Sequence, residues 1–320
     1  MPLFWVVTHA VLAIFAVAAA GALMRRFNWL SEEADSSLLA LTVRLLMPCL
    51  NLKVTMESEA LRRPENLLWP PLLGALTLGL GFGLAYLFTC FGCRVTGLTT
   101  DVERRTFRFV AGTLNHGYIP LPLVALLFDE QTLGVLMVFM VGVDLTFWTL
   151  GVLVLTGGLG NEWRSKLFNP PSLAVVVGVT LNLTGLSHHV PAFLRDAVGL
   201  MGPAAVPVGI LLVGAITADH LANVRWREGH APLLAAAVLR AVLAPAAILG
   251  LAVLLPLSPE LKRVLVVEAA MPAAMFSIVV TRYYRGDGPL AVRLVIATSL
   301  LALAAIPLWL SGGLTLLGLR

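Results

Sequence analysis

The stretch LNHGYIPLP, residues 114–122, lies within an apolar run that is long enough to cross a membrane. It places an asparagine, a histidine, a glycine and two prolines in one hydrophobic segment. Pro120 and Pro122 lack the backbone N–H that a helix needs, and Gly117 weakens the same turn. In hydrocarbon an unpaired backbone group costs several kcal/mol, so such a break persists only where protein, water or a ligand supplies the missing partners. The stretch therefore predicts a broken membrane helix with a function at the break.

The composition of the 320-residue chain indicates an integral membrane protein. Hydrophobic residues make up 58% and charged residues 12%, and the mean hydropathy is +0.90, more apolar surface than a soluble domain can bury. A spanning helix needs about 20 mostly apolar residues. Ten segments fit, some loosely: 3–24, 37–56, 67–91, 107–128, 132–157, 172–187, 193–218, 232–255, 261–283 and 289–311. Their runs are continuous rather than alternating, which favours an all-α protein of ten transmembrane helices.

Basic residues divide unequally between alternate loops. If the N-terminus is outside, the inner loops hold thirteen: Arg25, Arg26, Arg94, Arg104, Arg105, Arg108, Arg164, Lys166, Arg225, Arg227, Arg282, Arg285 and Arg293. The outer loops and edges then hold seven: Lys53, Arg62, Arg63, Arg195, Lys262, Arg263 and Arg320. This excess predicts a multi-pass protein of the plasma membrane (the bacterial inner membrane) with both termini outside. The net charge of +4 then reflects topology and does not indicate a nucleic-acid partner.

Ten spans divide into two halves of five, residues 1–157 and 158–320. Because five is odd, the second half must insert upside down relative to the first. Proline residues that can break a helix recur at matching places in the two halves. Pro48 and Pro120 are 72 residues apart in the first half, and Pro207 and Pro272 are 65 apart in the second. The pattern predicts two inverted repeats, with segments 4 and 9 broken and crossing at the midplane.

A crossing of two broken helices would bring exposed half-helix ends together. The N–H groups at half-helix N-termini carry partial positive charge that suits an anion. The carboxamide of Asn115 can grip a carboxylate without adding charge, and His116 can titrate near neutral pH. The alternative is a kinked structural helix in which Asn115 bonds a neighbouring carbonyl. The predicted substrate site consists of Asn115, His116, Gly117, Pro120 and Pro122 from segment 4, with Met271 and Pro272 from segment 9.

Four charged residues fall inside predicted spans: Asp144, Glu268, Arg240 and Arg44. Isolated charges are costly in a membrane and usually pair. They are candidates either for structural ion pairs or for coupling, in which Asp144 or Glu268 binds a proton beside a balancing cation. Cys90-Phe-Gly-Cys93 has the spacing of metal ligands, but no second pair completes a site, so we expect no metal and no cofactor.

Five stretches give the chain a family resemblance. They are LLMPCLNL (45–52), GTLNHGYIPLPLVALLFDEQTLGVLMVF (112–139), FNPPSLAVVVGVTLNLTGL (168–186), VPVGILLVGA (206–215) and VEAAMPAAMFSIVVTRYYRGDGPLAV (267–292). In order and spacing these stretches resemble the auxin efflux carrier family, including its bacterial members, over nearly the whole chain.

The resemblance implies a fold and a class of substrate. The fold is that of the bile acid sodium symporters, in which segments 1, 2, 5, 6, 7 and 10 would form a scaffold and segments 3, 4, 8 and 9 a core. The substrates would be small organic anions. The chain departs from plant members in its short central linker, 157–171, and in having Met271, Ala273 and Ala274 around Pro272 instead of an asparagine. A small mono- or dicarboxylate is therefore a better expectation than auxin.

Three classes of function compete. We expect a secondary active transporter that works by elevator-like alternating access. No GxxxxGK[ST] run is present, so ATP drive would need another subunit. A sodium-coupled symporter of a larger organic anion and an anion channel are the alternatives. An enzyme would have to use Ser187-His188-His189 or Asp219-His220, which complete no triad or metal set. The expected partners are an organic anion, a coupling proton or sodium ion, the lipid bilayer and, as an open alternative, a second copy of the chain.

Overall fold

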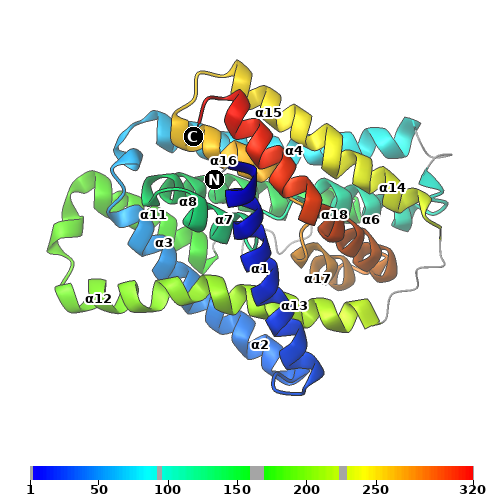
Figure 1. The fold of residues 1–320 in the computed structure, drawn as a ribbon, viewed down its shortest axis with the longest axis horizontal. Helices are drawn as coiled ribbons and strands as arrows, with labels where there is room; N and C mark the ends of the chain where they lie inside the picture. The colour runs from blue at the N-terminus through cyan, green and yellow to red at the C-terminus, as the bar shows by residue number, and fades with distance from the viewer. Residues whose placement is uncertain (1–2, 92–95, 159–168, 223–228, 320) are drawn as a thin grey trace.

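The computed structural model describes residues 3–91, 96–158, 169–222 and 229–319, and within these ranges every helix or strand element is a helix (Figure 1). Seven helices in the described residues are long and apolar enough to cross a membrane: Leu3–Arg26, Glu32–Met56, Glu65–Cys90, Glu130–Thr156, Ala192–Asp219, Ala231–Leu254 and Gly288–Leu316. Pro170–Thr184 is a shorter apolar helix. The chain is thus an all-helical, multi-pass membrane protein. Cys93 of the Cys90–Cys93 pair lies outside the described residues.

The helical elements follow one another along the chain. They are α1 (Leu3–Arg26), α2 (Glu32–Leu41), η1 (Thr42–Leu46), α3 (Met47–Met56), η2 (Ala60–Arg62), α4 (Glu65–Phe91), α6 (Asp101–Gly112), α7 (Pro120–Leu127), α8 (Glu130–Thr146), η3 (Phe147–Gly151), α9 (Val152–Thr156), α11 (Pro170–Thr184), η4 (Leu186–His189), α12 (Ala192–Met201), η5 (Gly202–Ala204), α13 (Ala205–Ala222), α14 (Ala231–Val238), η6 (Leu239–Leu243), α15 (Ala244–Leu254), α16 (Pro259–Ala269), α17 (Phe276–Tyr283) and α18 (Gly288–Leu316). Each of the ten predicted segments overlaps one or more of them.

Proline interrupts some segments and not others. Pro48 and Pro245 each lie two residues after a π-helical turn, η1 and η6, and the helix continues through both. A π turn widens the helix where the pyrrolidine ring would crowd the preceding carbonyl. Pro207 lies in the first turn of α13, where its missing N–H costs little. Pro48 and Pro207 therefore do not break their segments.

Segments 4 and 9 are broken, as the sequence predicts. In segment 4, α6 ends at Gly112 and α7 begins at Pro120. In segment 9, α16 ends at Ala269 and α17 begins at Phe276. The residues between these half-helices, 113–119 and 270–275, form no helix. We call them the first break and the second break.

The helices pack in two groups. In one group α1 packs on α13, and α11 and α12 pack on α3; Figure 1 shows α12 and α13 end to end, with α1 crossing α13. In the other group α4 packs on α8 and α6, α15 on α16, and α18 on α6 and α14. α8 thus packs mainly on α4 and α16, whereas α18 packs on α1 as well as on α6 and α14 and so contacts both groups.

Glycines permit the closest of these contacts. A Cβ on Gly214 would collide with the backbone of Ala18 in α1, and one on Gly142 would collide with the backbone of Pro71 in α4. Between helices in lipid, small residues allow backbones to approach and gain packing that burial alone does not supply. The sequence shows these glycines, but it does not show which helix each one faces.

Candidate substrate site

The two breaks pair with each other through their backbones. Leu114 and Ala273 form an antiparallel β-bridge. The N–H of Asn115 donates to the carbonyl oxygen of Pro272 at 2.8 Å, and the N–H of Ala274 donates to the carbonyl oxygen of Thr113 at 3.0 Å. These bonds satisfy backbone groups that proline and helix termination leave without helical partners. The predicted meeting of the two broken segments is observed.

A hydroxyl from a third helix completes this pairing. The N–H of Ala273 donates to Oγ1 of Thr298, in α18, at 3.2 Å. Thr298 is almost fully buried, as are Leu114 and Ala273. The second break is therefore held on one side by the first break and on the other by α18.

Four half-helix ends converge on the paired breaks. α6 and α16 end there, and α7 and α17 begin there. The N-termini of α7 and α17 present the positive ends of their helix dipoles. These dipoles favour an anion near the crossing without a formal charge. Backbone N–H groups of the breaks add little, because those of Asn115, Ala273 and Ala274 already donate to protein oxygens.

A cavity of about 300 Å³ lies beside this crossing. Asn115, Tyr118 and Met275 line it from the breaks, and Thr217 and Ser299 add hydroxyl groups from α13 and α18. The remaining wall is apolar and comes from α1, α13 and α18, together with Ile119. A cavity with a large apolar wall and a few converging polar groups is the usual form of a small-molecule site.

Asn115 is the most strongly constrained polar side chain of this cavity. It is 3% exposed, and its Oδ1 accepts a hydrogen bond from the backbone N–H of Tyr118 at 3.2 Å. That bond turns the acceptor end of the carboxamide back toward the chain. No other described residue accepts a hydrogen bond from its Nδ2, so the two N–H donors stay available to a ligand oxygen.

His116 points to a different neighbour from Asn115. It does not line the cavity; its Nδ1 lies 3.2 Å from the carbonyl oxygen of Leu114, and its Nε2 lies 3.6 Å from Oδ1 of Asp144 in α8. Oδ2 of Asp144 accepts hydrogen bonds from Oγ of Ser172 at 3.0 Å and from Nδ2 of Asn169 at 3.4 Å. Two of the predicted residues, His116 and Asp144, thus form a separate polar cluster.

Glu268 and Arg240 are the most deeply buried charged residues of the predicted set. Glu268 is 0% exposed and Arg240 is 4% exposed, and they interact electrostatically. Nε of Arg240 donates to the carbonyl oxygen of Ala111 at 2.7 Å, just before the first break. Neither carboxylate oxygen of Glu268 has a hydrogen-bond partner among the described residues. Arg240 therefore contacts the end of α6, and Glu268 lies in the last turn of α16, so both charges are near the breaks.

The other predicted residues have different places. Arg44 lies within the helical span Glu32–Met56, and its long side chain is exposed at the protein surface. Met271 and Pro272 are buried and do not line the cavity, although the carbonyl of Pro272 holds Asn115. Gly117 and Pro120 lie in the first break and at the start of α7, outside the cavity wall.

Sequence reasoning missed several residues of the cavity wall. Tyr118 and Met275 lie within the two breaks, and the breaks themselves were predictable from the sequence. Thr217, Ser299 and Phe15 come from α13, α18 and α1, and no pattern in their own segments marks them. They belong to the site only because α1, α13 and α18 pack beside the crossing.

A second cavity, of about 480 Å³, lies on the α7 side of the crossing. It is lined by Pro122 and by three charged residues, Lys53, Asp129 and Glu130. Ile14 and Ile210 line both cavities and so form part of the wall between them. Lys53 and Glu130 lie 3.8 Å apart as an ion pair. The charged residues lie at the end of this cavity formed by the loop between α7 and α8 and by α3, and the rest of its wall is mainly apolar.

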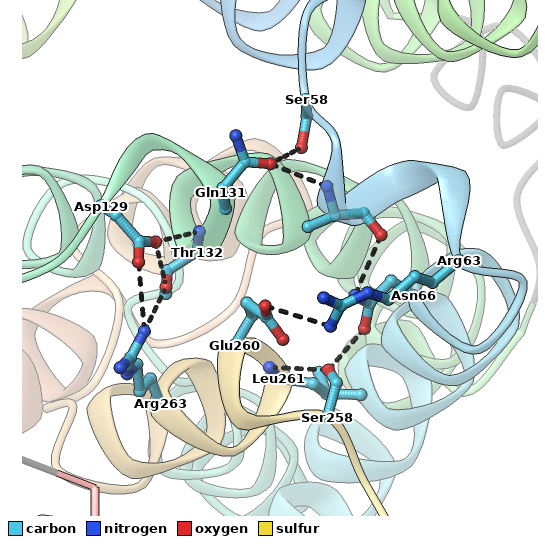
Figure 2. A network of polar contacts seen from close by, with 11 residues as sticks. Ser58, Arg63, Asn66, Asp129, Gln131, Thr132, Ser258, Glu260, Leu261 and Arg263 are labelled. Carbon is cyan, nitrogen blue, oxygen red and sulfur yellow. Dashed lines mark hydrogen bonds and ion pairs between the residues drawn. The ribbon is translucent and has the colours of Figure 1, made fainter.

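A polar network ties the loops together at the same end (Figure 2). Arg263 of α16 contacts Asp129 at 3.3 Å, and Arg63 contacts Glu260 at 3.4 Å. Gln131 accepts hydrogen bonds from Oγ of Ser58 and from the backbone N–H of Ala60, and Asn66 accepts one from Ser258. The loops that follow predicted segments 2, 4 and 8 therefore meet at one end of the molecule, as alternating topology requires.

A multi-pass helical bundle with two broken, paired helices beside a cavity is an arrangement typical of membrane transporters. The chain belongs to the family described as membrane transport protein, whose model matches residues 6–162 and 159–310. The resemblance to the auxin efflux carrier family is thereby confirmed.

Two curated relatives agree with this assignment. One, from Methanothermobacter thermautotrophicus, is named an uncharacterized transporter and is 26% identical over 306 residues, 94% of this chain and 97% of its own length. Another, from Methanocaldococcus jannaschii, carries the same description and is 24% identical over 306 residues, 93% of this chain and 96% of its own length. The family and these relatives are transporters, not enzymes.

Proposed function

We propose that the protein is a secondary active transporter of a small organic anion, a mono- or dicarboxylate, which binds at the crossing of the two breaks. The observation that carries the proposal is the carboxamide of Asn115, which lines a cavity of about 300 Å³ with its N–H donors unused by other described residues. α7 and α17 begin next to Ile119 and Met275, which line the same cavity. A charged-acceptor hydrogen bond contributes about 1.5–3 kcal/mol, enough to select a carboxylate without trapping it.

Packing supports an inverted repeat of residues 1–157 and 158–320. In such a repeat segment 1 corresponds to 6, 2 to 7, 4 to 9 and 5 to 10. The contact of α1 with α13 then corresponds to that of α11 with α3, and both contacts are extensive. The contact of α6 with α18 corresponds likewise to that of α16 with α8. Inverted repeats of this kind exchange roles to open a central site first to one side and then to the other.

Alternating access would then move one packing group against the other. We propose that α4, α6, α7, α8, α14 to α17 and α18 move together as the core, and that α1, α3, α11, α12 and α13 form the scaffold. The cavity lies where these groups meet, because Asn115 and Met275 belong to the core and Phe15 and Thr217 to the scaffold. A vertical shift of the core would carry the anion past the apolar wall of α1 and α13.

Orientation can be tested separately. The excess of basic residues on one side predicts both termini outside and residues 96–106 inside. A cysteine introduced at Leu319 should react with a membrane-impermeant maleimide in intact cells, whereas one introduced at Arg104 should react only after lysis. The reverse labelling would overturn the topology.

An uptake screen tests the function itself. Purified protein in proteoliposomes is offered radiolabelled lactate, malonate and malate under imposed proton or sodium gradients. We expect saturable uptake of at least one carboxylate that exceeds uptake by protein-free vesicles and disappears in Asn115→Asp. Uptake that does not saturate and carries a steady ionic current would indicate a channel instead.

A further inference from the structure

We propose that His116 and Asp144 form a proton-binding site that couples proton movement to transport of the anion. This inference rests on the proposed function, but it concerns a different cluster from the cavity that holds Asn115. His116 directly follows Asn115 in the first break. A movement of the imidazole therefore reaches Asn115, the residue proposed to bind the substrate, through a single peptide unit. Asp144 joins the same imidazole to α11.

The hydrogen bonds fix which imidazole nitrogen can take up a proton. Nδ1 of His116 faces the carbonyl oxygen of Leu114 at 3.2 Å. A carbonyl oxygen only accepts, so Nδ1 carries the hydrogen and the neutral ring has its lone pair on Nε2. Nε2 faces Oδ1 of Asp144 at 3.6 Å. Two acceptors that face each other repel unless a proton lies on one of them, so this geometry favours binding of one proton by the pair.

Hydrogen bonds from α11 hold the other oxygen of the Asp144 carboxyl group. Ser172 and Asn169, in the first turn and at the N-cap of α11, donate to Oδ2. The N-terminus of α11 adds the positive end of its dipole. Because α11 packs on α3 and α8 packs on α4, Asp144 connects the two packing groups. When His116 is protonated, it attracts the carboxylate of Asp144 toward the first break. When His116 is neutral, the carboxylate keeps only its hydrogen bonds to α11.

Other charged groups near α8 are engaged elsewhere. The helices that pack on α8 are η2, α3, α4, α7, α11 and α16, and the charged residues they carry are Arg62, Lys53, Glu65, Glu260, Lys262, Arg263 and Glu268. Within the described residues none of these forms an ion pair with His116 or Asp144. Lys53 pairs with Glu130, Arg263 with Asp129, and Glu268 interacts with Arg240. Among the described residues, Asp144 is therefore the charged group that pairs with His116.

The proton balance follows from this arrangement. On one side of the membrane Nε2 binds one proton from water, and the imidazolium is neutralised by Asp144. On the other side the same proton returns to water and the ring becomes neutral. One proton that moves with a monocarboxylate transfers no net charge, whereas one proton that moves with a dicarboxylate transfers one negative charge.

The first experiment needs no substrate. The protein contains six histidines, so ¹⁵N-histidine spectra in nanodiscs resolve few signals, and His116→Gln identifies the one of interest. We expect that signal to respond to pH in the wild type, and its response to change in Asp144→Asn. The exposed controls His9→Gln and Asp101→Asn should leave it unchanged. If the signal does not respond to pH, or if its response is the same in a folded Asp144→Asn variant, the assignment is wrong.

The second experiment measures coupling. Pyranine-loaded proteoliposomes report proton entry while the uptake of labelled lactate, malonate or malate is counted. We expect at least a tenfold loss of proton entry per carboxylate in Asp144→Asn and in His116→Gln, and none in Asp101→Asn. Unchanged proton entry in both variants would overturn the proton site but would not contradict the proposed transport of a carboxylate. If no carboxylate enters wild-type vesicles, the proposed function fails, and the titration alone decides the proton site.

Glu268→Gln is the competing variant in both experiments. Glu268 is buried and lacks a hydrogen-bond partner among the described residues, so it is the other carboxyl group in a span that could hold a proton. If Glu268→Gln abolishes proton entry and Asp144→Asn does not, the coupling residue is Glu268 and the assignment to His116 and Asp144 is overturned. Ser172→Ala, which removes one donor to Asp144, should alter the coupling only partly.

Discussion

The two breaks have the same backbone arrangement but carry different side chains. Each interrupts a span between two half-helices, and each supplies backbone groups to the shared pairing. The first break contributes polar side chains, Asn115 to the cavity and His116 to Asp144. The second contributes a carbonyl, two N–H groups and an apolar core around Met271. A repeated architecture can thus hold a site whose chemistry comes almost entirely from one repeat.

The largest effect is expected at Asn115. Asn115→Asp changes the shape little but can set a negative charge against an anionic ligand, so we expect uptake to be abolished. Asn115→Ala removes the hydrogen bond, and apparent affinity should weaken roughly ten- to a hundredfold. Initial uptake rates over a range of carboxylate concentrations measure both variants.

Size-exclusion profiles in detergent serve as the control for Asn115. Both variants should elute as the wild type does, because the backbone N–H, not the side chain, makes the bond to Pro272. A variant that fails to fold would show that Asn115 is structural. Normal transport by Asn115→Asp with an ionised side chain would place the anion elsewhere.

At the second break we expect an effect on stability rather than on affinity. Met271 is fully buried and does not line the cavity. Met271→Ala leaves a void in the core and should cost about 2–5 kcal/mol of unfolding free energy. Its apparent affinity for the carboxylate, measured below the unfolding transition, should stay within about twofold of wild type. If Met271→Ala lost much affinity while its stability was unchanged, the second break would also contribute to substrate binding, and the contrast with the first break would be wrong.

The sequence anticipates one break better than the other. Pro120, Pro122 and Gly117 together mark the first break, because each disfavours a helix for its own reason. Pro272 alone marks the second, and its neighbours Met271 and Ala273 are ordinary helix formers. Periodicity could not show that His116 faces Asp144, since that contact depends on how α8 packs beside the first break. Position within a span also does not say which side of the helix is buried, and the side chain of Arg44 is exposed.

A smaller effect is expected at Thr298, which supports the second break from α18. Thr298→Val keeps the shape and removes the oxygen that accepts from the N–H of Ala273. The unpaired buried N–H should cost about 1–3 kcal/mol. Thermal unfolding followed by tryptophan fluorescence measures the loss, and Thr298→Ser, which keeps the hydroxyl, should recover most of it. Equal losses in both variants would mean that the methyl group and not the hydroxyl supports the break.

The smallest effect is expected where the ends of the two broken segments meet. Asp129 follows α7 and caps α8, and it contacts Arg263 of α16 at 3.3 Å (Figure 2). Burial alone would raise the pKa of the Asp129 carboxyl, but hydrogen bonds from Thr132 and the charge of Arg263 outweigh it and lower that pKa below its ordinary value of 3.8. Asp129→Asn keeps a capping oxygen and loses only an exposed ion pair, so we expect a cost below about 1 kcal/mol. Asp129→Ala also loses the cap and should cost about 0.5–2 kcal/mol.

The pH dependence of this small effect has a definite sign. Because the pKa of Asp129 is lowered in the folded protein, its ionised form stabilises the fold at pH values above 3.8, and the stabilisation is lost as the pH falls through the lower, folded value. The difference in unfolding temperature between wild type and Asp129→Asn should therefore be constant near neutral pH and shrink below about pH 4. If Asp129→Asn instead costs as much as Met271→Ala, the two broken segments are held together at their ends as firmly as at their crossing. The contacts at the crossing would then contribute no more to stability than those at the ends of the segments.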